Sequence, residues 1–402
     1  MRSKLYRGMF LSVTKDTSNK VRDYSELNIL EHQIWKDYCP IYYDFIYTIP
    51  LSFQSLTVQW LPYQEKTTDN FLKQRLILAT FTERKSRDYL QVVELEIPLD
   101  DAVIDSSTYK TDGSFGNLGG IETKPIKVIS RMFHPTEINR ARYMPQNSDL
   151  IAVISSEAVW VYNSKQPKEK PIKLEGQTEE GYGLSWSNHI KGNILSGSFD
   201  QYVRTWNIEN QNKLFSYKLP NKIGDASWHP RDENYFGAAC DNGNFYLFDT
   251  RTKEPTISLQ AHSEETNCLS FNPIFSELFA TGSSDTNIHI WDVRNLSQPL
   301  RKLKGHSNGV FVLSWNPLNP SVLGSCGDDN VVILWDLSNQ NHPILFQHNG
   351  HTDTVREFSW NENIPFVIAS VSFGNILQIW EMNGELYSGL NQITNIPSIQ
   401  KI

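Results

Sequence analysis

The sequence has few cysteines, no long apolar run and no concentration of positive charge. Its 402 residues include four cysteines, none in a CxxC pair, which indicates a reducing compartment and argues against a structural zinc site. No apolar stretch has the 18 residues that suggest a transmembrane helix, and the basic start MRSKLYRGMFLSV is too interrupted for a secretory signal. We therefore expect a protein with no membrane partner, no metal and no cofactor.

The charge balance bears on possible partners. The formal net charge is -8, and no basic stripe interleaved with aromatic residues is present. Direct sequence-specific binding to nucleic acid is therefore not expected, because such binding depends on cations that neutralise phosphates. An acidic surface suits a basic protein ligand, but it also serves solubility alone, and the composition leaves both readings open.

What the sequence does contain is a repeat. A Ser is followed 21 positions later by a large aromatic residue in five places: Ser185 to Trp206, Ser227 to Phe248, Ser270 to Trp291, Ser314 to Trp335 and Ser359 to Trp380. The aromatics lie 42 to 45 residues apart and close short apolar runs such as IHIWDVR. This period with Trp-Asp endings predicts one four-stranded blade per repeat, and hence an all-β WD-repeat β-propeller.

Polar residues recur in the same register. A His lies eight residues before the Ser in three repeats (His262, His306 and His351), and an Asp follows the first two of these by 23 residues (Asp285 and Asp329). A catalytic triad would be built once, whereas this set recurs. We expect it to form a structural hydrogen-bond network of Asp, His, Ser and Trp in each blade, so the protein is not expected to be an enzyme.

The rest of the chain divides around the repeats. Residues 1–22 are expected to be disordered or loosely attached, 23–48 to form a helix and linker, 49–383 to form the propeller, and 384–402 to be a C-terminal tail. Three N-terminal strand-like runs and a unit without the Ser signature (138–163) bring the number of blades to seven. Residues 100–124 are typical of a long surface loop.

Two predictions concern the N-terminal segment. Leu27, Leu30, Ile34 and Tyr38 are spaced by three and four, which predicts an amphipathic helix packed on the side of the propeller, with Ser25 as N-cap and Pro40 beyond its end. A propeller must also close without leaving a free sheet edge. We expect SLTVQWLP (55–62), with or without a C-terminal strand, to be the closing element.

The chain resembles the retinoblastoma-binding family of WD-repeat histone chaperones. This family supplies the small subunit of chromatin assembly factor one, the type B histone acetyltransferase, and deacetylase, remodelling and Polycomb complexes. The resemblance extends over about residues 27–383. The segments that carry it are IWKDYCPIYYDF, SLTVQWLP, INRARYMPQN (138–147), EGYGLSW (180–186), WHPRDENYFG (228–237) and AHSEETNCLSFNP (261–273).

The resemblance implies a site for the N-terminal arm of histone H3, or of partners that mimic it, on one face of the propeller. The positions that match it are Glu137, Asn139, Arg140, Glu180, Tyr182, Asp241, Asn267 and Phe311. Carboxylates would pair with Arg and Lys of the arm, and aromatics would cover their aliphatic stems. The chain departs from the family at Gly224, Gly309 and Phe373, where the family carries acidic residues, so a basic arm would lose up to three charged contacts.

The resemblance also implies a groove for the first helix of histone H4 beside the N-terminal helix. The apolar positions that match it are Leu30, Ile34, Tyr38, Ile344 and Phe346. Docking the helix on the propeller is an equally good explanation for the first three. The family's acidic insertion is missing, because only Ser338 to His342 separates the WDL ending from the next strand.

The resemblance thus predicts a non-catalytic histone-binding subunit with histones H3 and H4 and the larger subunits of chromatin complexes as partners. Its expected location is the nucleus, and also the cytoplasm. The alternative is a diverged nuclear WD-repeat scaffold with weak or no direct histone binding. A ubiquitin-ligase adaptor has no support beyond the architecture.

Overall fold

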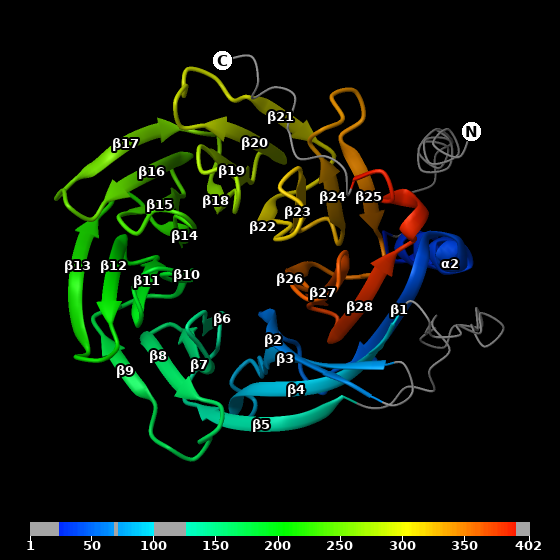
Figure 1. Ribbon diagram of the computed structural model, residues 1–402, viewed down its shortest axis with the longest axis horizontal. Coiled ribbons are helices and arrows are strands. Elements are labelled where there is room, and N and C mark those ends of the chain that lie inside the picture. The colour runs from blue at the N-terminus through cyan, green and yellow to red at the C-terminus, as the bar shows by residue number, and fades with distance from the viewer. Residues whose placement is uncertain (1–23, 68–70, 100–125, 391–402) are drawn as a thin grey trace.

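The computed structural model describes residues 24–67, 71–99 and 126–390, in which seven four-stranded antiparallel sheets surround a central axis (Figure 1). The predicted seven-bladed β-propeller is confirmed. Segments 1–22 and 100–124, predicted to be loosely attached and a surface loop, lie outside the described residues, as does most of the predicted tail. No helix in the described ranges is long and apolar enough to cross a membrane.

Each blade is formed mostly by consecutive strands. Blade 1 contains β2 (Val58–Lys66), β3 (Phe71–Ala79), β4 (Asp88–Pro98) and β5 (Lys127–His134). Blade 2 contains β6 (Arg140–Met144), β7 (Asn147–Ile154), β8 (Ala158–Asn163) and β9 (Ile172–Glu175). Blade 3 contains β10 (Gly181–Trp186), β11 (Asn193–Ser198), β12 (Tyr202–Asn207) and β13 (Asn212–Lys218). Blade 4 contains β14 (Ile223–Trp228), β15 (Tyr235–Cys240), β16 (Asn244–Asp249) and β17 (Pro255–Gln260).

The remaining blades follow the same plan. Blade 5 contains β18 (Thr266–Phe271), β19 (Leu278–Ser283), β20 (Asn287–Asp292) and β21 (Arg301–Lys304). Blade 6 contains β22 (Val310–Trp315), β23 (Val322–Gly327), β24 (Val332–Asp336) and β25 (Ile344–His348). Blade 7 contains β26 (Val355–Trp360), β27 (Val367–Ser372), β28 (Ile376–Met382) and β1 (Tyr43–Pro50). The short 3-10 helix η3 (Gly384–Leu386) follows β28.

The position of a strand in its blade determines its residue types. The second strands β11, β19, β23 and β27 are buried along their whole length, because neighbouring blades cover both of their faces. They are accordingly made of small and apolar residues, as in VLGSCG. The first strands bury four of six positions in β10, β14, β18, β22 and β26. Their remaining side chains are left partly accessible near the axis.

The strand that closes the propeller is β1, which corrects the sequence prediction. It pairs antiparallel with β28, so that Ile46 lies opposite Trp380 (Figure 1). SLTVQWLP instead supplies β2, the innermost strand of blade 1. The propeller therefore begins at Tyr43 rather than at residue 49, and the predicted linker is mostly strand. The order of closure is the usual one, because an N-terminal strand covers the edge of the last blade.

The repeated polar network exists, but its hydroxyl was assigned to the wrong strand. The Trp indole of each network donates to a Ser or Thr ten residues before it on the second strand. The four pairs are Trp206 to Ser196 (3.0 Å), Trp291 to Thr281 (3.0 Å), Trp335 to Ser325 (2.8 Å) and Trp380 to Ser370 (3.2 Å). In blade 6, His306 links Ser325 (2.7 Å) to Asp329 (2.8 Å). The network ties the turn between second and third strands to the blade interior.

The five Ser residues of the 21-residue register lie instead on the first strands. All five line a cavity of about 310 Å³ on the central axis, together with residues that include Gln59 and Tyr143. Some of them also connect adjacent blades: Ser185 Oγ accepts a hydrogen bond from the Trp228 amide (3.1 Å), and Ser359 Oγ accepts one from the Trp60 amide (3.2 Å). A fixed sequence spacing could not distinguish a first-strand hydroxyl from a second-strand one.

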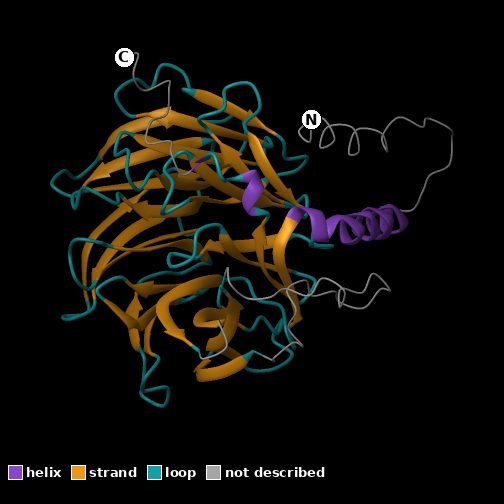
Figure 2. Ribbon diagram, turned by 45° about the vertical axis from the view of Figure 1, so that its right-hand side comes forward, coloured by secondary structure: helices purple, strands orange, loops and turns teal. Residues whose placement is uncertain are grey.

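The helix α2 (Tyr24–Tyr42) projects from the rim beside blades 6 and 7 (Figure 2). Two sequence predictions about its ends were wrong, because the helix includes Pro40 and already begins before Ser25. A proline near the C-terminus of a helix removes one backbone hydrogen bond. The chain accommodates this loss because Cys39 and Tyr43, on either side, are both buried.

Candidate functional site: the axial face and the outer helix

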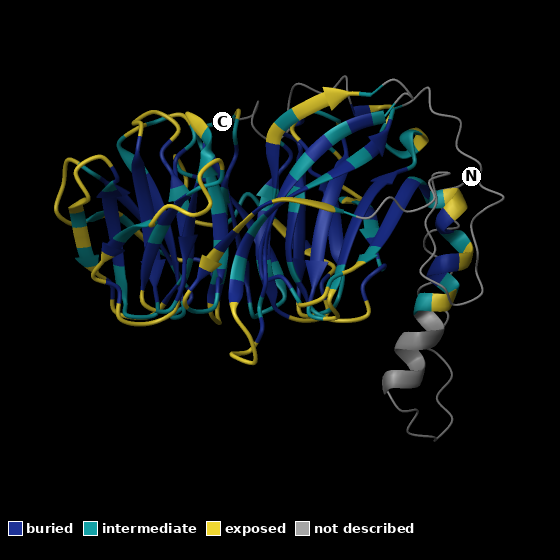
Figure 3. Ribbon diagram, turned by 90° about the horizontal axis from the view of Figure 1, so that it is seen from below, coloured by how far each residue is buried: buried dark blue, intermediate teal, exposed yellow. Residues whose placement is uncertain are grey.

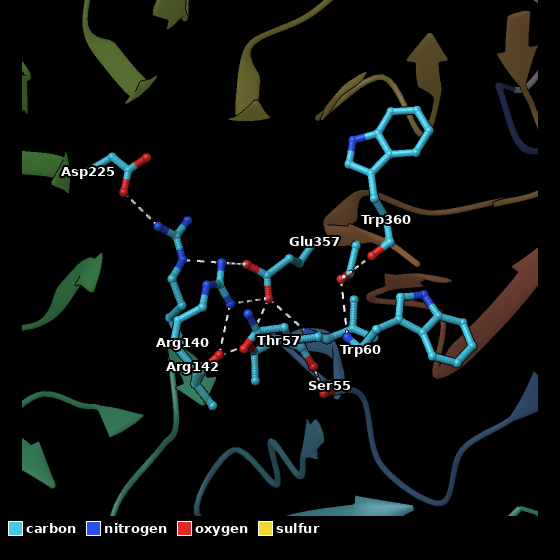
Figure 4. A network of polar contacts seen from close by, with 12 residues as sticks. Ser55, Thr57, Trp60, Arg140, Arg142, Asp225, Glu357 and Trp360 are labelled. Carbon is cyan, nitrogen blue, oxygen red and sulfur yellow. Dashed lines mark hydrogen bonds and ion pairs between the residues drawn. The ribbon is translucent and has the colours of Figure 1, made fainter. Parts of the chain in front are cut away.

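A buried ionic network crosses the axis of the propeller (Figure 4). Arg140 on β6 donates to Asp225 on β14 (2.7 Å), and Arg142, two residues further, forms an ion pair with Glu357 on β26 (2.5 Å). Glu357 also accepts bonds from the Thr57 hydroxyl (2.7 Å) and the Val58 amide (2.8 Å). Side chains from blades 1, 2, 4 and 7 are thus joined through one set of charges.

The electrostatics of this network are balanced. Burial disfavours ionisation of Glu357, but Arg142 and Arg140 outweigh it and lower the pKa of the carboxyl. Burial likewise opposes the charge on Arg140, whose pKa is nevertheless raised by Asp225 and Glu357. Every charge in the network is therefore matched by an opposite charge, which is the condition under which buried ions are tolerated.

One residue per blade is displaced from the strand ladder where the first strands begin. The register of the first and second strands shifts at this point in blades 3 to 7. We call the skipped residues the bulge ring: Tyr182, Gly224, Asn267, Phe311 and Arg356. Bulges re-aim a side chain and are frequent beside functional sites. The bulge ring lies around the axis, at the end of the propeller where each innermost strand starts (Figure 1).

The structure places the predicted H3-arm residues at this end of the propeller. Tyr182, Asn267 and Phe311 belong to the bulge ring, and Glu180 is exposed just before β10. The Tyr182 hydroxyl donates to Glu180 (3.3 Å), and its ring packs against Phe199. Burial and the neighbouring Glu180 raise the pKa of Tyr182. These residues are positioned to contact a ligand.

Asp241 also lies at this end, in the turn after β15. It is half-buried, and burial raises the pKa of its carboxyl, an effect that the Lys222 ammonium opposes. Like Glu180, it contributes negative charge to the rim.

Other predicted residues of the arm site have structural roles. Asn139 is 7% exposed and donates to the Gly181 carbonyl (3.1 Å). Arg140 is committed to the ionic network, and Glu137 is paired with Arg84 (2.8 Å). The prediction that Asn139 and Arg140 are free to bind an arm is therefore wrong. Their hydrogen-bonding groups hold neighbouring blades together instead.

The three departures from the family pattern have different structural explanations. A Cβ at Gly224 would approach the Asn267 carbonyl oxygen to 2.8 Å, so blades 4 and 5 leave no room for a side chain. A Cβ at Gly309 would meet nothing closer than 3.5 Å, so an acidic residue would fit there. Phe373 carries the guanidinium of Arg356 over its ring, 4.7 Å from the centroid. A cation thus stands where the family pattern places a carboxylate.

The second candidate surface is α2. Its docked side consists of Trp35, Lys36 and Cys39, which are 8%, 9% and 0% exposed. The Trp35 indole donates to the Tyr43 hydroxyl (2.9 Å) and meets His348 edge to face. Tyr43 in turn bonds to His348 (2.8 Å). The helix is therefore fixed by a buried aromatic and hydrogen-bonded contact with blades 6 and 7.

The opposite side of α2 remains partly accessible. Ile34, Tyr38 and Tyr42 are half-buried and four residues apart, and Ile41 is 59% exposed. We call Ile34, Tyr38 and Ile41 the outer stripe. Figure 3 shows exposed and half-buried positions along the helix beside the buried ones. The helix is thus not sealed against the propeller on this side. Of the predicted residues, Leu30 lies in the part of α2 whose side chains are outside the described set.

The predicted lining from β25 is not confirmed. Phe346 is 1% exposed and packs edge to face on Tyr43, with ring centroids 5.2 Å apart, so it belongs to the core and cannot contact a partner. Ile344 is 40% exposed, but it lies beside Gly305, whereas α2 contacts His348 at the other end of β25. The alternation along a strand does not reveal which neighbour covers each face.

The loop before β25 is short, as predicted. Arg301 fixes it by donating to the carbonyls of Leu337 (2.6 Å), Asn339 (3.0 Å) and Gln340 (3.1 Å). No acidic insertion flanks α2 at this point.

Comparison with known families agrees with this geometry. Residues 30–99 match a family model that describes the histone-binding protein RBBP4, a component of the CAF1 complex. The chain belongs to the RBBP4-like family. Residues 122–335, more than half of the chain, match a model described as the EIPR1 β-propeller, so the propeller also belongs to the fold family that this model describes.

The extents of the two matches are informative for this RBBP4-like chain. The first includes Leu30, Ile34 and Tyr38 of α2, but neither Ile344 nor Phe346. Arg356 and Phe373 lie beyond the residues matched by either model. Arg356 was not predicted from the sequence, although its position three residues before Ser359 is equivalent to those of Tyr182, Asn267 and Phe311 before their own register serines.

The structure offers no assembled catalytic or metal centre in the ranges it describes. No group of three or more His, Cys, Asp or Glu residues there could hold a metal ion. The polar networks that resemble a triad recur from blade to blade. RBBP4-like propellers are typically non-catalytic scaffolds, and the sites that we identify are surfaces for binding.

Proposed function

We propose that this protein is a non-catalytic histone-binding adaptor that holds the first helix of histone H4 against the outer stripe of α2. The observation that carries the proposal is an apolar stripe left partly accessible on a helix whose other side is docked. An amphipathic helix recognises such a surface through apolar anchors at intervals of three and four residues. The match of residues 30–99 to a histone-binding family supports the same segment.

The proposal extends to the setting of the protein. We infer that it serves as a small subunit in chromatin assembly, acetyltransferase, deacetylase or Polycomb complexes, in the nucleus and also in the cytoplasm. The wider role is an H3-H4 chaperone, with the H3 arm or a mimic of it at the axial face. Because the acidic insertion beside α2 is missing, we expect the H4 interaction to depend mainly on apolar contacts and only weakly on salt concentration.

The decisive measurement is binding of a synthetic H4 first-helix peptide, followed by calorimetry at low salt. Charge insertion by Ile34→Glu or Ile41→Glu is expected to weaken binding at least tenfold, because anchor residues typically contribute about 2 kcal/mol or more. Leu214→Glu is the matched control: Leu214 is 53% exposed on β13, away from α2, so this variant should bind like the unmutated protein.

A second function is favoured by specific observations. Phe346 is buried, Ile344 lies away from α2, and two of the predicted arm residues serve structure. A scaffold that docks into a complex without histone affinity of its own would have this pattern. Failure of the unmutated protein to bind H4 and H3 peptides would establish the scaffold and refute the adaptor.

A further inference from the structure

Arg356 has an unusual environment at the axial face. Its guanidinium lies over two phenyl rings from different blades, 4.7 Å from the centroid of Phe373 and 5.5 Å from that of Phe311. Its Nε is buried without a hydrogen-bond partner. No ion pair or hydrogen bond of this side chain occurs among the described residues. Two aromatic faces hold the cation in place, while its charge remains uncompensated.

The other arginines near the axis differ in this respect. Arg140 and Arg142 have carboxylate partners in Asp225 and Glu357. The nearby Asp328 is engaged elsewhere, because it accepts bonds from Asn308 (2.9 Å) and from the Thr354 hydroxyl (2.8 Å). Buried donors are normally satisfied, and an unsatisfied one costs about 1–3 kcal/mol. Arg356 therefore retains donors for which the described chain supplies no acceptor.

The position of Arg356 makes it accessible to a ligand at the axis. It is only half-buried, and it occupies the bulge ring beside Phe311. Its charge acts on the hydroxyl of Tyr182, a bulge-ring residue in blade 3. A group bound at the centre of the ring would lie within the field of the same cation.

The charges around the ring restrict the class of ligand. Glu180, Asp241 and Glu265 are negative groups at the same end of the propeller, and the whole chain has a net charge of -8. A polyanion such as nucleic acid would be repelled by this rim. A uniformly basic segment would suit the rim but would meet the Arg356 cation on the aromatic face that its own side chains would use.

We propose that the bulge ring binds a peptide segment in which an acidic residue is flanked by basic ones, and that Arg356 receives the carboxylate. A guanidinium held between two rings is already oriented, so little side-chain freedom is lost when it forms charge-assisted bonds to a carboxylate. The basic flanks of the peptide contact the Glu180 and Asp241 side of the ring. This binding is separate from the α2 surface and does not depend on histone H4.

The test uses the full-length protein and three labelled peptides in a fluorescence anisotropy titration. The peptides have the sequence Lys-Gly-Ala-X-Ala-Gly-Lys, with blocked ends and with Glu, Gln or Lys at X. We expect the Glu peptide to bind about tenfold more tightly than the Gln peptide, the ratio that one charge-assisted hydrogen bond supplies. The Lys peptide is expected to bind more weakly than the Gln peptide.

Variants identify the residue responsible. Arg356→Gln should reduce the Glu-to-Gln ratio to about one, and Arg356→Lys should retain part of it, because an ammonium keeps the charge but lacks the planar fork. Arg131→Gln is the matched control: Arg131 also lies over an aromatic ring, 3.7 Å from the centroid of Tyr89, but on the outer strand of blade 1. Thermal unfolding of each variant verifies that it is folded.

Four results would overturn the proposal. They are equal affinities for the three peptides, tightest binding of the Lys peptide, no binding of any peptide, and a Glu preference that survives Arg356→Gln. None of them bears on H4 binding at α2, so the two proposals fail independently.

Discussion

Individual residues near the axis show how strongly the propeller depends on matched charge. Glu357 comes from the last blade, and the two arginines that pair with it come from blade 2, more than 200 positions earlier in the chain. Its carboxylate also accepts the Thr57 hydroxyl and the Val58 amide of blade 1. One side chain therefore connects the beginning and the end of the propeller around its axis.

Replacement of this carboxylate is expected to be costly. Glu357→Gln keeps the shape but leaves Arg140 and Arg142 with one carboxylate fewer, which should lower the free energy of unfolding by about 3–5 kcal/mol. Urea denaturation followed by tryptophan fluorescence measures the change. Glu362→Gln is the control, because Glu362 is exposed and bonds only to Tyr143 (3.3 Å), so its loss should cost less than about 1 kcal/mol. Equal losses in the two variants would contradict the assigned role of the network.

At the scale of elements, α2 is held by one side only. The contact from Trp35 through Tyr43 to His348 continues to Gln378 (2.8 Å), which reaches Thr48 on the closing strand (3.0 Å). The docking of the helix is thus coupled to the strand that closes the ring. Any partner bound on the outer stripe would act on an element with this single attachment.

Loss of the Trp35 side chain is expected to release the helix. Trp35→Ala removes a buried aromatic and its hydrogen bond, a change that typically costs about 3–5 kcal/mol. Amide hydrogen exchange should therefore accelerate in residues 32–42, while the inner strands stay protected. Gln33→Ala, at an exposed position of the same helix, should leave exchange unchanged. Uniform acceleration throughout the propeller would instead mean that α2 and the blades unfold as one unit.

The whole molecule carries several histidines that folding keeps neutral. Burial lowers the pKa of His134 to about 3, of His262 to about 4 and of His351 to about 3. Above about pH 6.5 these residues are neutral in both the folded and the unfolded chain. Below it, the unfolded chain binds protons that the folded chain excludes, so stability falls as the pH falls toward the folded-state values.

We expect the free energy of unfolding to decrease between about pH 6.5 and about 4, by up to about 1.4 kcal/mol per pH unit for each histidine. Urea denaturation at stepped pH tests this. His351→Gln should reduce the slope by one proton, and a Gln is tolerated at this position because Gln177 occupies the equivalent place in blade 3. A stability that is constant across this range would be incompatible with neutral buried histidines.

Some of these features were accessible from the sequence because they repeat. The Trp and His residues of the blades were correctly assigned to structure, since the same spacing occurs again and again. The Ser was not, because Ser325 and Ser314 are both compatible with the pattern and only one of them meets Trp335. On α2, the pair Trp35 and Cys39 has the same four-residue spacing as Ile34 and Tyr38, so periodicity could not decide which pair docks.

The sequence by itself determined the propeller, because each blade is a set of strands adjacent in the chain and its pattern is local. The tertiary structure alone decided what the faces of the propeller present. It assigned closure to β1, placed Phe346 in the core and left the outer stripe of α2 accessible. It also brought Arg356 between the rings of Phe311 and Phe373. Contacts between separate blades depend on how the ring closes, and no local pattern encodes that.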